Sequence, residues 1–262
     1  MESRTLLEEA VRCLKDNKPA ALATVIRAAG STPVRVGAKM LVYADGTIQG
    51  SIGGGKLEAQ VIEEARQAIL SRKPNFFEYR LKADDAAGLG MVCGGEVSVF
   101  IEPLFSAPEL LIAGAGHISQ YLSQLGKMLG FQVVVVDDRE DFANKERFPE
   151  ADRLIVNNIE QTLAEYEISA NTFIVIVTRG HQYDQEALEK VLDSEAAYFG
   201  MIGSREKVKT VFDNLRSKGF KEELLNKVYA PIGLKLGGKN PAEIAVSIIA
   251  EILQVRYAQK KE

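Results

Sequence analysis

The chain has 262 residues, of which 46% are hydrophobic and 26% are charged, and its formal net charge is −4. This composition is ordinary for a globular protein of one large or two smaller domains, and the acidic balance argues against nucleic acid or an anionic membrane as the main partner. No apolar run approaches the roughly 20 residues that span a bilayer, and the charged, acidic N-terminus is unlike a signal peptide, so we expect a cytoplasmic protein.

The first part of the chain alternates between short strand patterns and two helix patterns. Asp45-Gly46 is a hairpin signal, which predicts that the strands on either side of it pair antiparallel. Mixed strands and helices of this kind predict an α+β domain over residues 1–102. The predicted helices cover residues 3–16 and 57–69, and the predicted strands cover residues 20–26, 39–43, 47–52, 76–81 and 96–101.

Three glycine-bearing segments separate these elements and are the predicted ligand contacts of this domain. The first is the long loop 27–40, in which Arg35 either faces an anionic ligand or is solvated. The second is Gly53-Gly54-Gly55, which enters a helix and therefore has a geometry that suits an anion. Glu58, in the first turn of that helix, either complements the helix dipole or contacts a ligand. The third is the segment 82–95, which contains Cys93.

The two cysteines give neither a disulfide framework nor the spacing of a metal finger. We therefore predict a reduced protein without a metal site of its own. Cys13 lies in an amphipathic helix and is expected to pack in the core. Cys93 lies in a glycine-rich loop, where a thiol is more accessible, and accessibility is a condition for reactivity.

The proline-bounded segment 103–108 is the predicted linker, and the second domain is predicted to cover residues 109–262. Residues 109–139 follow the order strand, glycine turn, helix, strand, which is typical of a dinucleotide-binding βαβ unit. Gly114 permits a tight turn, and Gly116 lets a pyrophosphate approach the backbone. Asp137, 21 residues after Gly116, is placed to accept hydrogen bonds from ribose hydroxyls. Ser119 stands where a third glycine or alanine is usual.

Strand and helix patterns continue to alternate after this unit, which predicts a Rossmann-like parallel sheet and an α/β class for the whole chain. The predicted strands cover 153–156, 171–177 and 197–202, and the predicted helices cover 185–192, 205–218 and a final segment that begins at Pro241. Ligands bind beyond the carboxyl ends of such strands. The ligand-binding candidates of this domain are Gly114, Gly116, His117, Asp137, His181 and Arg205, with Thr178, Arg179 and Asp184 at the same edge.

Seven motifs occur in a fixed order along nearly the whole chain, and together they resemble the XdhC/CoxI family. They read G-S-T-P-V-R-V-G-A-K-M, G-S-I-G-G-G-K-L-E, M-V-C-G-G-E-V, G-A-G-H-I, V-T-R-G-H-Q-Y-D, M-I-G-S-R-E-K and P-I-G-L-K-L-G-G-K-N-P. The resemblance implies a chaperone that binds a molybdopterin-type molybdenum cofactor and supports its sulfuration. Such a chaperone hands the cofactor to a xanthine dehydrogenase-type apo-hydroxylase. A sulfur donor protein and a homodimer are the further partners it implies.

The same resemblance assigns cofactor contacts in the first domain, namely Ser31, Arg35, Ser51, Gly53, Gly54, Gly55, Glu58 and Cys93. One position departs from the family pattern, because Lys56 stands where many members have a cysteine after the glycines. Thiolates are soft ligands that suit such metals. The departure leaves Cys93 as the thiol for contact with molybdenum or sulfur, while Lys56 can pair with a phosphate.

The ligand of the Rossmann half stays open between two molecules, because the dinucleotide form of the cofactor and NAD(P) both carry a pyrophosphate and ribose. Asp137 disfavours a 2′-phosphate, which favours NAD over NADP. A second reading is therefore an NAD-dependent oxidoreductase with His117 or His181 as the proton donor. A third is a regulatory protein that binds a nucleotide without chemistry.

Overall fold

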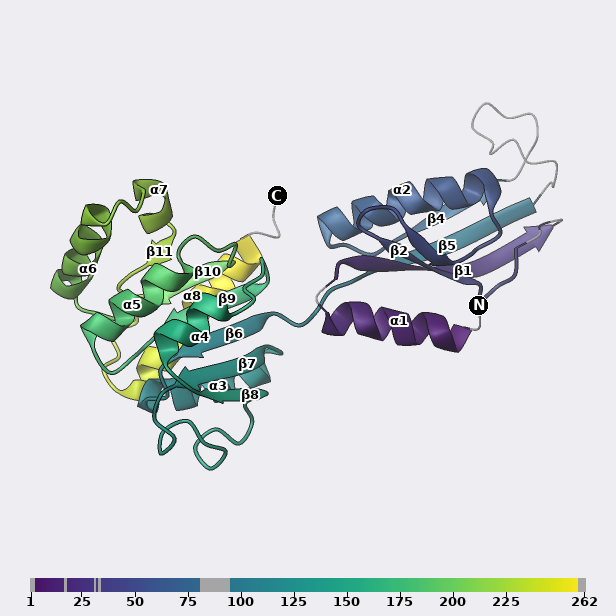
Figure 1. Ribbon diagram of the computed structural model, residues 1–262. Coiled ribbons are helices and arrows are strands. Elements are labelled where there is room, and N and C mark those ends of the chain that lie inside the picture. The colour runs from purple at the N-terminus through teal and green to yellow at the C-terminus, as the bar shows by residue number, and fades with distance from the viewer. Residues whose placement is uncertain (1–2, 17, 31, 33, 81–94, 259–262) are drawn as a thin grey trace. The chain divides into compact units, whose positions relative to one another are not determined.

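The computed structural model describes residues 3–16, 18–30, 32, 34–80 and 95–258. The chain forms two compact units, Met1–Ser106 and Ala107–Glu262 (Figure 1). The first unit contains an antiparallel sheet and the second a parallel one, which confirms the predicted α/β class with a Rossmann-like second half.

The sheet of the first unit has five antiparallel strands in the order β3-β2-β1-β5-β4. Strands β2 and β3 pair across the Asp45-Gly46 turn, as the hairpin signal predicts. The strands are β1 Ala20–Gly30, β2 Lys39–Tyr43, β3 Ile48–Gly50, β4 Asn75–Arg80 and β5 Gly95–Leu104, and the helices are α1 Ser3–Lys15 and α2 Gly55–Ser71.

One helix covers each face of this sheet, because side chains of a strand alternate between the two faces. On β1, the side chains of Ala21, Ala23 and Val25 belong to the core beneath α2. Ala20 lies on the opposite face, where it packs with Leu41 and the buried residues of α1. Each face is therefore closed by an amphipathic helix.

Two strands of this unit extend well beyond their predicted ends. Strand β1 continues through Gly30, four residues into the segment predicted as a loop, because β5 runs alongside it and supplies hydrogen-bond partners as far as Gly95. Strand β5 in turn continues through Pro103 to Leu104, into the predicted linker. A proline is tolerated there because β4, the neighbour on the other side, pairs only as far as Ile101.

The second unit is a six-stranded parallel sheet in the order β11-β10-β9-β6-β7-β8. Three elements of this unit, at residues 159–165, 222–225 and 228–229, have no counterpart among the predicted ones. The strands are β6 Glu109–Ala113, β7 Gln132–Asp137, β8 Arg153–Val156, β9 Thr172–Ile176, β10 Tyr198–Met201 and β11 Val228–Tyr229. The helices are α3 His117–Met128, α4 Ile159–Glu165, α5 His181–Val191, α6 Arg205–Ser217, α7 Glu222–Leu225 and α8 Pro241–Ala258.

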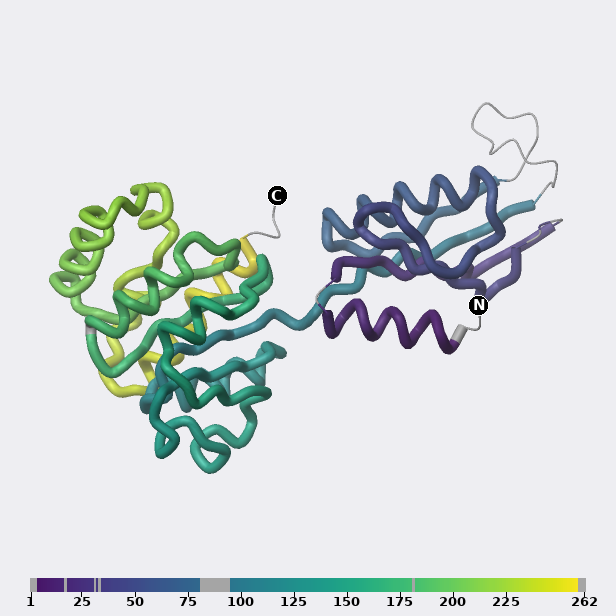
Figure 2. Tube along the Cα trace, in the orientation of Figure 1, coloured from purple at the N-terminus to yellow at the C-terminus, as the bar shows by residue number. Residues whose placement is uncertain are grey.

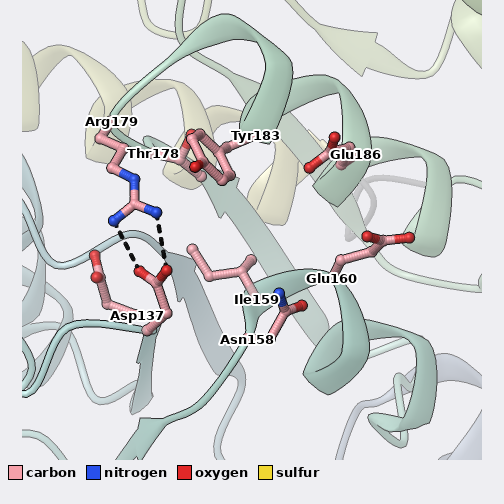
Figure 3. A pocket seen from close by; sticks show the side chains of 9 residues that line it. Asp137, Asn158, Ile159, Glu160, Thr178, Arg179, Tyr183 and Glu186 are labelled. Carbon is pink, nitrogen blue, oxygen red and sulfur yellow. Dashed lines mark hydrogen bonds and ion pairs between the residues drawn. The ribbon is translucent and has the colours of Figure 1, made fainter.

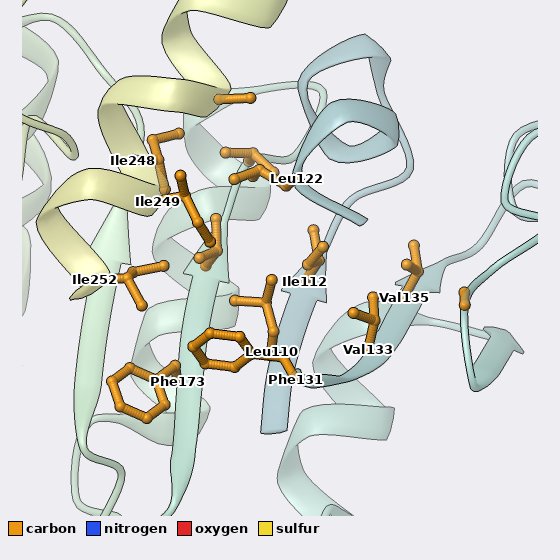
Figure 4. Close-up of a cluster of buried hydrophobic side chains, with 14 of the residues drawn as sticks. Leu110, Ile112, Leu122, Phe131, Val133, Val135, Phe173, Ile248, Ile249 and Ile252 are labelled. Carbon is orange, nitrogen blue, oxygen red and sulfur yellow. The ribbon is translucent and has the colours of Figure 1, made fainter. Parts of the chain in front are cut away.

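Helices bury both faces of this sheet, and the middle residues of the central strands β6, β7 and β9 are accordingly apolar. Helices α3 and α8 cover one face, where Leu122 and Ile248 pack against Leu110 and Val133 (Figure 4). Helices α4, α5 and α6 cover the other face. The trace in Figure 2 shows α4 and α5 next to each other on that face.

The strand order determines where a ligand can bind. Strand β6 lies between β9 and β7, and the chain leaves β6 towards α3 on one face but leaves β9 towards α5 on the other. The two loops diverge at the carboxyl edge, which is the usual position of a ligand crevice in such sheets. Within the described residues, no helix is long and apolar enough to cross a membrane.

Helix α5 begins at His181, four residues before its predicted start at Gln185. The Asp184 carboxylate accepts hydrogen bonds from the Thr178 N–H at 3.0 Å and the Thr178 hydroxyl at 2.6 Å. These bonds fold the end of β9 against the first turn of the helix. His181 is thus the first helical residue rather than part of an extended turn.

Candidate functional site

The glycine turn after β6 has a backbone that only glycine tolerates at its first position. Gly114 has φ of +107°, and a Cβ built there would lie 2.5 Å from the Val177 carbonyl oxygen. Its own N–H donates to the Val136 carbonyl at 2.8 Å, and its carbonyl accepts the buried Ser119 hydroxyl at 2.5 Å. Ser119 therefore replaces the usual small residue and also fastens the turn to α3.

Gly116 precedes α3 and leaves the start of that helix accessible. Its φ of −75° and ψ of −172° are allowed for any residue. A Cβ built there meets no heavy atom within 4 Å. Gly116 has no side chain with which to cap the first N–H groups of α3, so these donors are left for water or an anionic ligand. His117, the first residue of α3, is exposed.

The Asp137 side chain, predicted to bind ribose, already has several hydrogen-bond donors around it. It is 2% exposed, and it accepts bonds from Arg139 Nε and Nη2, both at 2.8 Å, and from the Ala115 N–H at 2.7 Å. Burial alone would raise the pKa of this carboxyl, but these bonds outweigh it and hold the pKa below its usual value. For a ribose to reach Asp137 as predicted, Arg139 has to move.

A cleft opens beside this carboxylate at the carboxyl ends of β7, β8 and β9 (Figure 3). It is shallow: its non-atom space of about 370 Å³ includes open solvent, and only about 20 Å³ admits the centre of a water-sized molecule. Arg179 pairs with Asp138 there through two bonds of 2.9 and 3.1 Å, and it stacks on the Tyr183 ring. The lining combines carboxylates, one amide, an arginine and an aromatic ring, which suits a polar group more than an apolar one. It consists of Asp137, Asp138, Asn158, Ile159, Glu160, Thr178, Arg179, Tyr183 and Glu186.

Two further arginines flank the glycine turn, and no sequence motif assigns them a role. Arg139 and Arg147 both stack on the Phe142 ring, with guanidinium carbons 3.8 and 4.9 Å from its centroid. Arg147 Nη2 also donates to the Ala115 carbonyl at 3.4 Å. Arg153 stacks on Tyr166 in the same way, although it lies away from the turn. An arginine near an aromatic residue in the sequence therefore does not by itself identify Arg147 as a residue of the turn.

The remaining candidates of the second unit are more dispersed. The side chain of His181 lies outside the described residues. Arg205 is exposed at the start of α6, where Ser204 caps the helix by accepting the Lys207 N–H at 3.3 Å. Arg205 is not among the residues that line the cleft. The structure thus brings the glycine turn and Asp137 together, through the bond from the Ala115 N–H to the Asp137 carboxylate.

In the first unit, the glycine turn before α2 is formed around a carboxylate of the chain itself. Gly53, Gly54 and Gly55 have φ of +124°, +77° and +69°, which side chains disfavour. Glu58 Oε2 accepts bonds from the Ser51 hydroxyl at 2.6 Å and from the N–H groups of Ile52 and Gly54, both at 3.2 Å. The predicted anion geometry is therefore present, and Glu58 occupies it.

Other predicted contacts of this unit lie close to the turn or outside the description. Val34 packs against Gly53, because a Cβ on that glycine would meet its Cγ2 at 2.8 Å. This contact joins the loop that carries Arg35 to the glycine turn. The side chains of Arg35 and Lys56 are exposed. Ser31 and Cys93 lie outside the described residues.

Replacing Glu58 with alanine is expected to destabilise the first unit by about 1–3 kcal/mol, because three donors lose their acceptor. Urea denaturation monitored by hydrogen exchange of α2 measures the effect. Glu63→Ala on the same helix is the matched control, since its ion pair with Arg66 is exposed at 60% and 45% and contributes at most about 1 kcal/mol. Equal losses in the two variants would contradict a special role of Glu58.

Both units of the chain match models of the same protein family. Residues 13–80 match the family described as XdhC and CoxI, and residues 110–252 match its companion, described as the XdhC Rossmann domain. Among solved structures, the chain is similar to one titled a xanthine dehydrogenase from Bacillus halodurans, with a TM-score of 0.54 and 25% identity. The similarity covers 100% of this chain and 97% of that one.

Two proteins of Escherichia coli strain K12 are similar over nearly the whole chain. One, named uncharacterized protein YqeB, is 39% identical over 252 residues, which are 96% of this chain and 46% of YqeB. The chain therefore spans about half the length of that relative. The other is named molybdenum cofactor insertion chaperone PaoD, and it is 23% identical over 291 residues, covering 100% of this chain and 91% of PaoD.

Proposed function

The chain belongs to the XdhC and CoxI family, and we propose that it is a chaperone that binds a molybdenum cofactor and inserts it into a xanthine dehydrogenase-type hydroxylase. The observation that carries this proposal is the end-to-end similarity to a relative named as a molybdenum cofactor insertion chaperone, which covers 100% of this chain. The cofactor is cargo in this function. The chain has to hold it and release it rather than transform it.

The geometry of the second unit fits the anionic part of such a cargo. The turn at Gly116 offers open space, uncapped helix N–H groups and adjacent arginine side chains. A pyrophosphate satisfies those donors. The proposal therefore favours the dinucleotide form of the cofactor, because that form carries the pyrophosphate.

Sulfuration of the cofactor is the finer part of the proposal, and it assigns the thiol chemistry to Cys93. The chain has two cysteines. Cys13 is 1% exposed, and burial together with nearby Glu9 raises its thiol pKa, so that it stays protonated. Lys56 stands at the position where many members carry another cysteine. On this proposal a sulfur donor protein and the apo-hydroxylase approach the Cys93 segment, and the chaperone works as a homodimer.

An NAD-dependent oxidoreductase is the alternative that the glycine turn and Asp137 support. It needs a proton donor that is held in place, and the candidates are His117 and His181. His117 is exposed at the start of α3. NAD binding without pterin retention would favour this alternative.

The proposal is tested by expressing the chain together with the molybdopterin pathway, purifying it, oxidising the sample and measuring the fluorescent pterin. We expect retained pterin in wild type. Gly116→Asp adds a carboxylate where the anion would bind, whereas Gly116→Ala adds only a methyl group, so the pair separates charge repulsion from loss of access to the backbone. Cys93→Ala tests the thiol in the same assay. Activation of an apo-hydroxylase by each protein is the second readout.

Each outcome of this test has a definite meaning. Loss of pterin in Gly116→Asp, with a smaller loss in Gly116→Ala, supports binding of the dinucleotide at the turn. Loss of pterin only in Cys93→Ala would assign cofactor binding to the first unit. The Gly114–Gly116 turn would then be available for another nucleotide. Wild type that neither retains pterin nor activates the hydroxylase would overturn the chaperone function.

A further inference from the structure

The charges around the second glycine turn are unequally compensated. Of the three arginines at the turn and cleft, Arg139 pairs with Asp137 and Arg179 pairs with Asp138. Arg147 has no carboxylate partner among the described residues. Its positive charge therefore adds to that of the α3 N-terminus, which lies next to Ala115 in the chain.

The hydrogen bonding of Arg147 is also incomplete. Its guanidinium carries five N–H bonds, and within the described part of the chain only the bond from Nη2 to the Ala115 carbonyl uses one of them. Its Nε is buried and has no hydrogen-bond partner there. A buried donor without an acceptor is costly and calls for an explanation. This Nε is closed to solvent, so a ligand can reach the guanidinium only through the N–H bonds of its two terminal nitrogens.

Other contacts hold Arg147 beside the turn before any ligand binds. Its guanidinium stacks on Phe142, and its carbonyl accepts a bond from Gln120 of α3 at 3.4 Å. Phe142 packs in turn against the core beneath α3. The segment after β7 thus delivers a cation to the place where the glycine turn exposes backbone donors.

We propose that Arg147 binds the diphosphate of a nucleoside diphosphate at the Gly114–Gly116 turn. Arginine suits this role because its planar fork matches phosphate oxygens in a bidentate arrangement. The proposal deepens the proposed function, because both NAD and the dinucleotide form of the molybdenum cofactor contain this group. It makes Arg147 the residue that selects for the diphosphate.

Titration calorimetry with ADP and with adenosine tests this role, since the two probes differ only in the diphosphate. We expect Arg147→Ala to weaken ADP binding about tenfold or more, while the affinity for adenosine changes less than about twofold. Arg147→Lys keeps the charge but not the fork and is expected to be intermediate. Arg153→Ala, at the start of β8 and away from the carboxyl edge, is the matched control and should leave both affinities unchanged.

NAD and the purified molybdopterin dinucleotide are the further probes, and they distinguish the two sources of the diphosphate. Equal weakening of ADP and adenosine in Arg147→Ala would mean that the residue only supports the fold, and would overturn the proposal. Absence of ADP binding in wild type would overturn it as well. If Arg147→Ala retains as much pterin as wild type, the role of Arg147 is contradicted but the chaperone function is not. If wild type binds ADP but retains no pterin, the chaperone function is contradicted but the role of Arg147 is not.

Discussion

Replacing Gly114 with alanine is expected to destabilise the second unit by about 3–5 kcal/mol, the sum of a disfavoured backbone and a steric clash. The residue has φ of +107°, and the added Cβ would lie 2.5 Å from the Val177 carbonyl oxygen and 2.9 Å from the Thr178 Cα. Both atoms belong to the backbone at the end of β9, so no side-chain rotation relieves the clash. The strands β6 and β9 would have to separate at the centre of the sheet.

Gly116→Ala is the matched control, because it adds the same methyl group two residues later in the same turn. Its backbone angles suit alanine and its Cβ meets nothing within 4 Å, so we expect a change below about 0.5 kcal/mol. Amide hydrogen exchange of β6 and β9 in urea measures both variants, since a chain of two units need not unfold in one transition. Equal stability of the two variants would show that the turn is looser than its contacts indicate.

Asp137→Asn is expected to cost about 2–4 kcal/mol, somewhat less than a fully buried pair because Arg139 is 29% exposed. The amide that replaces the carboxylate presents N–H groups to Arg139 and Ala115, which are themselves donors. Asp138→Asn is the matched control, since the Asp138–Arg179 pair has both side chains 36% exposed and contributes at most about 1 kcal/mol. Similar losses would mean that burial does not distinguish the two pairs.

The same variant makes a prediction about pH. The pKa of Asp137 is lowered in the folded protein, so its contribution to stability is complete above the unfolded value of about 3.9 and is lost as pH falls through the folded value. We expect the stability difference between wild type and Asp137→Asn to be constant from about pH 6 to 8 and to shrink below about pH 4. A difference that instead changes near neutral pH would assign the effect to another group.

The pattern of residues along the chain determined much of the architecture. Apolar alternation and helical periodicity predict most strands and helices. Burial of one face makes apolar residues recur at a fixed spacing, which can be recognised within a short stretch of sequence. The order of strand, glycine turn, helix and strand over residues 109–139 predicts the parallel sheet and its ligand edge. The ends of the elements were predicted less well. For example, β1 extends to Gly30 because β5 pairs with it that far.

The tertiary structure decided which polar groups face one another at the candidate sites. Glycine spacing predicts a turn rich in free N–H groups before α2, but Glu58 occupies it. The spacing of Asp137 predicts a ribose contact, but Arg139 covers the carboxylate. Arg147 lies 32 residues after Ala115 and reaches its carbonyl. Local periodicity reports which side of an element is buried, whereas the partner of a charged side chain depends on distances that exist only after the sheet and its loops have assembled.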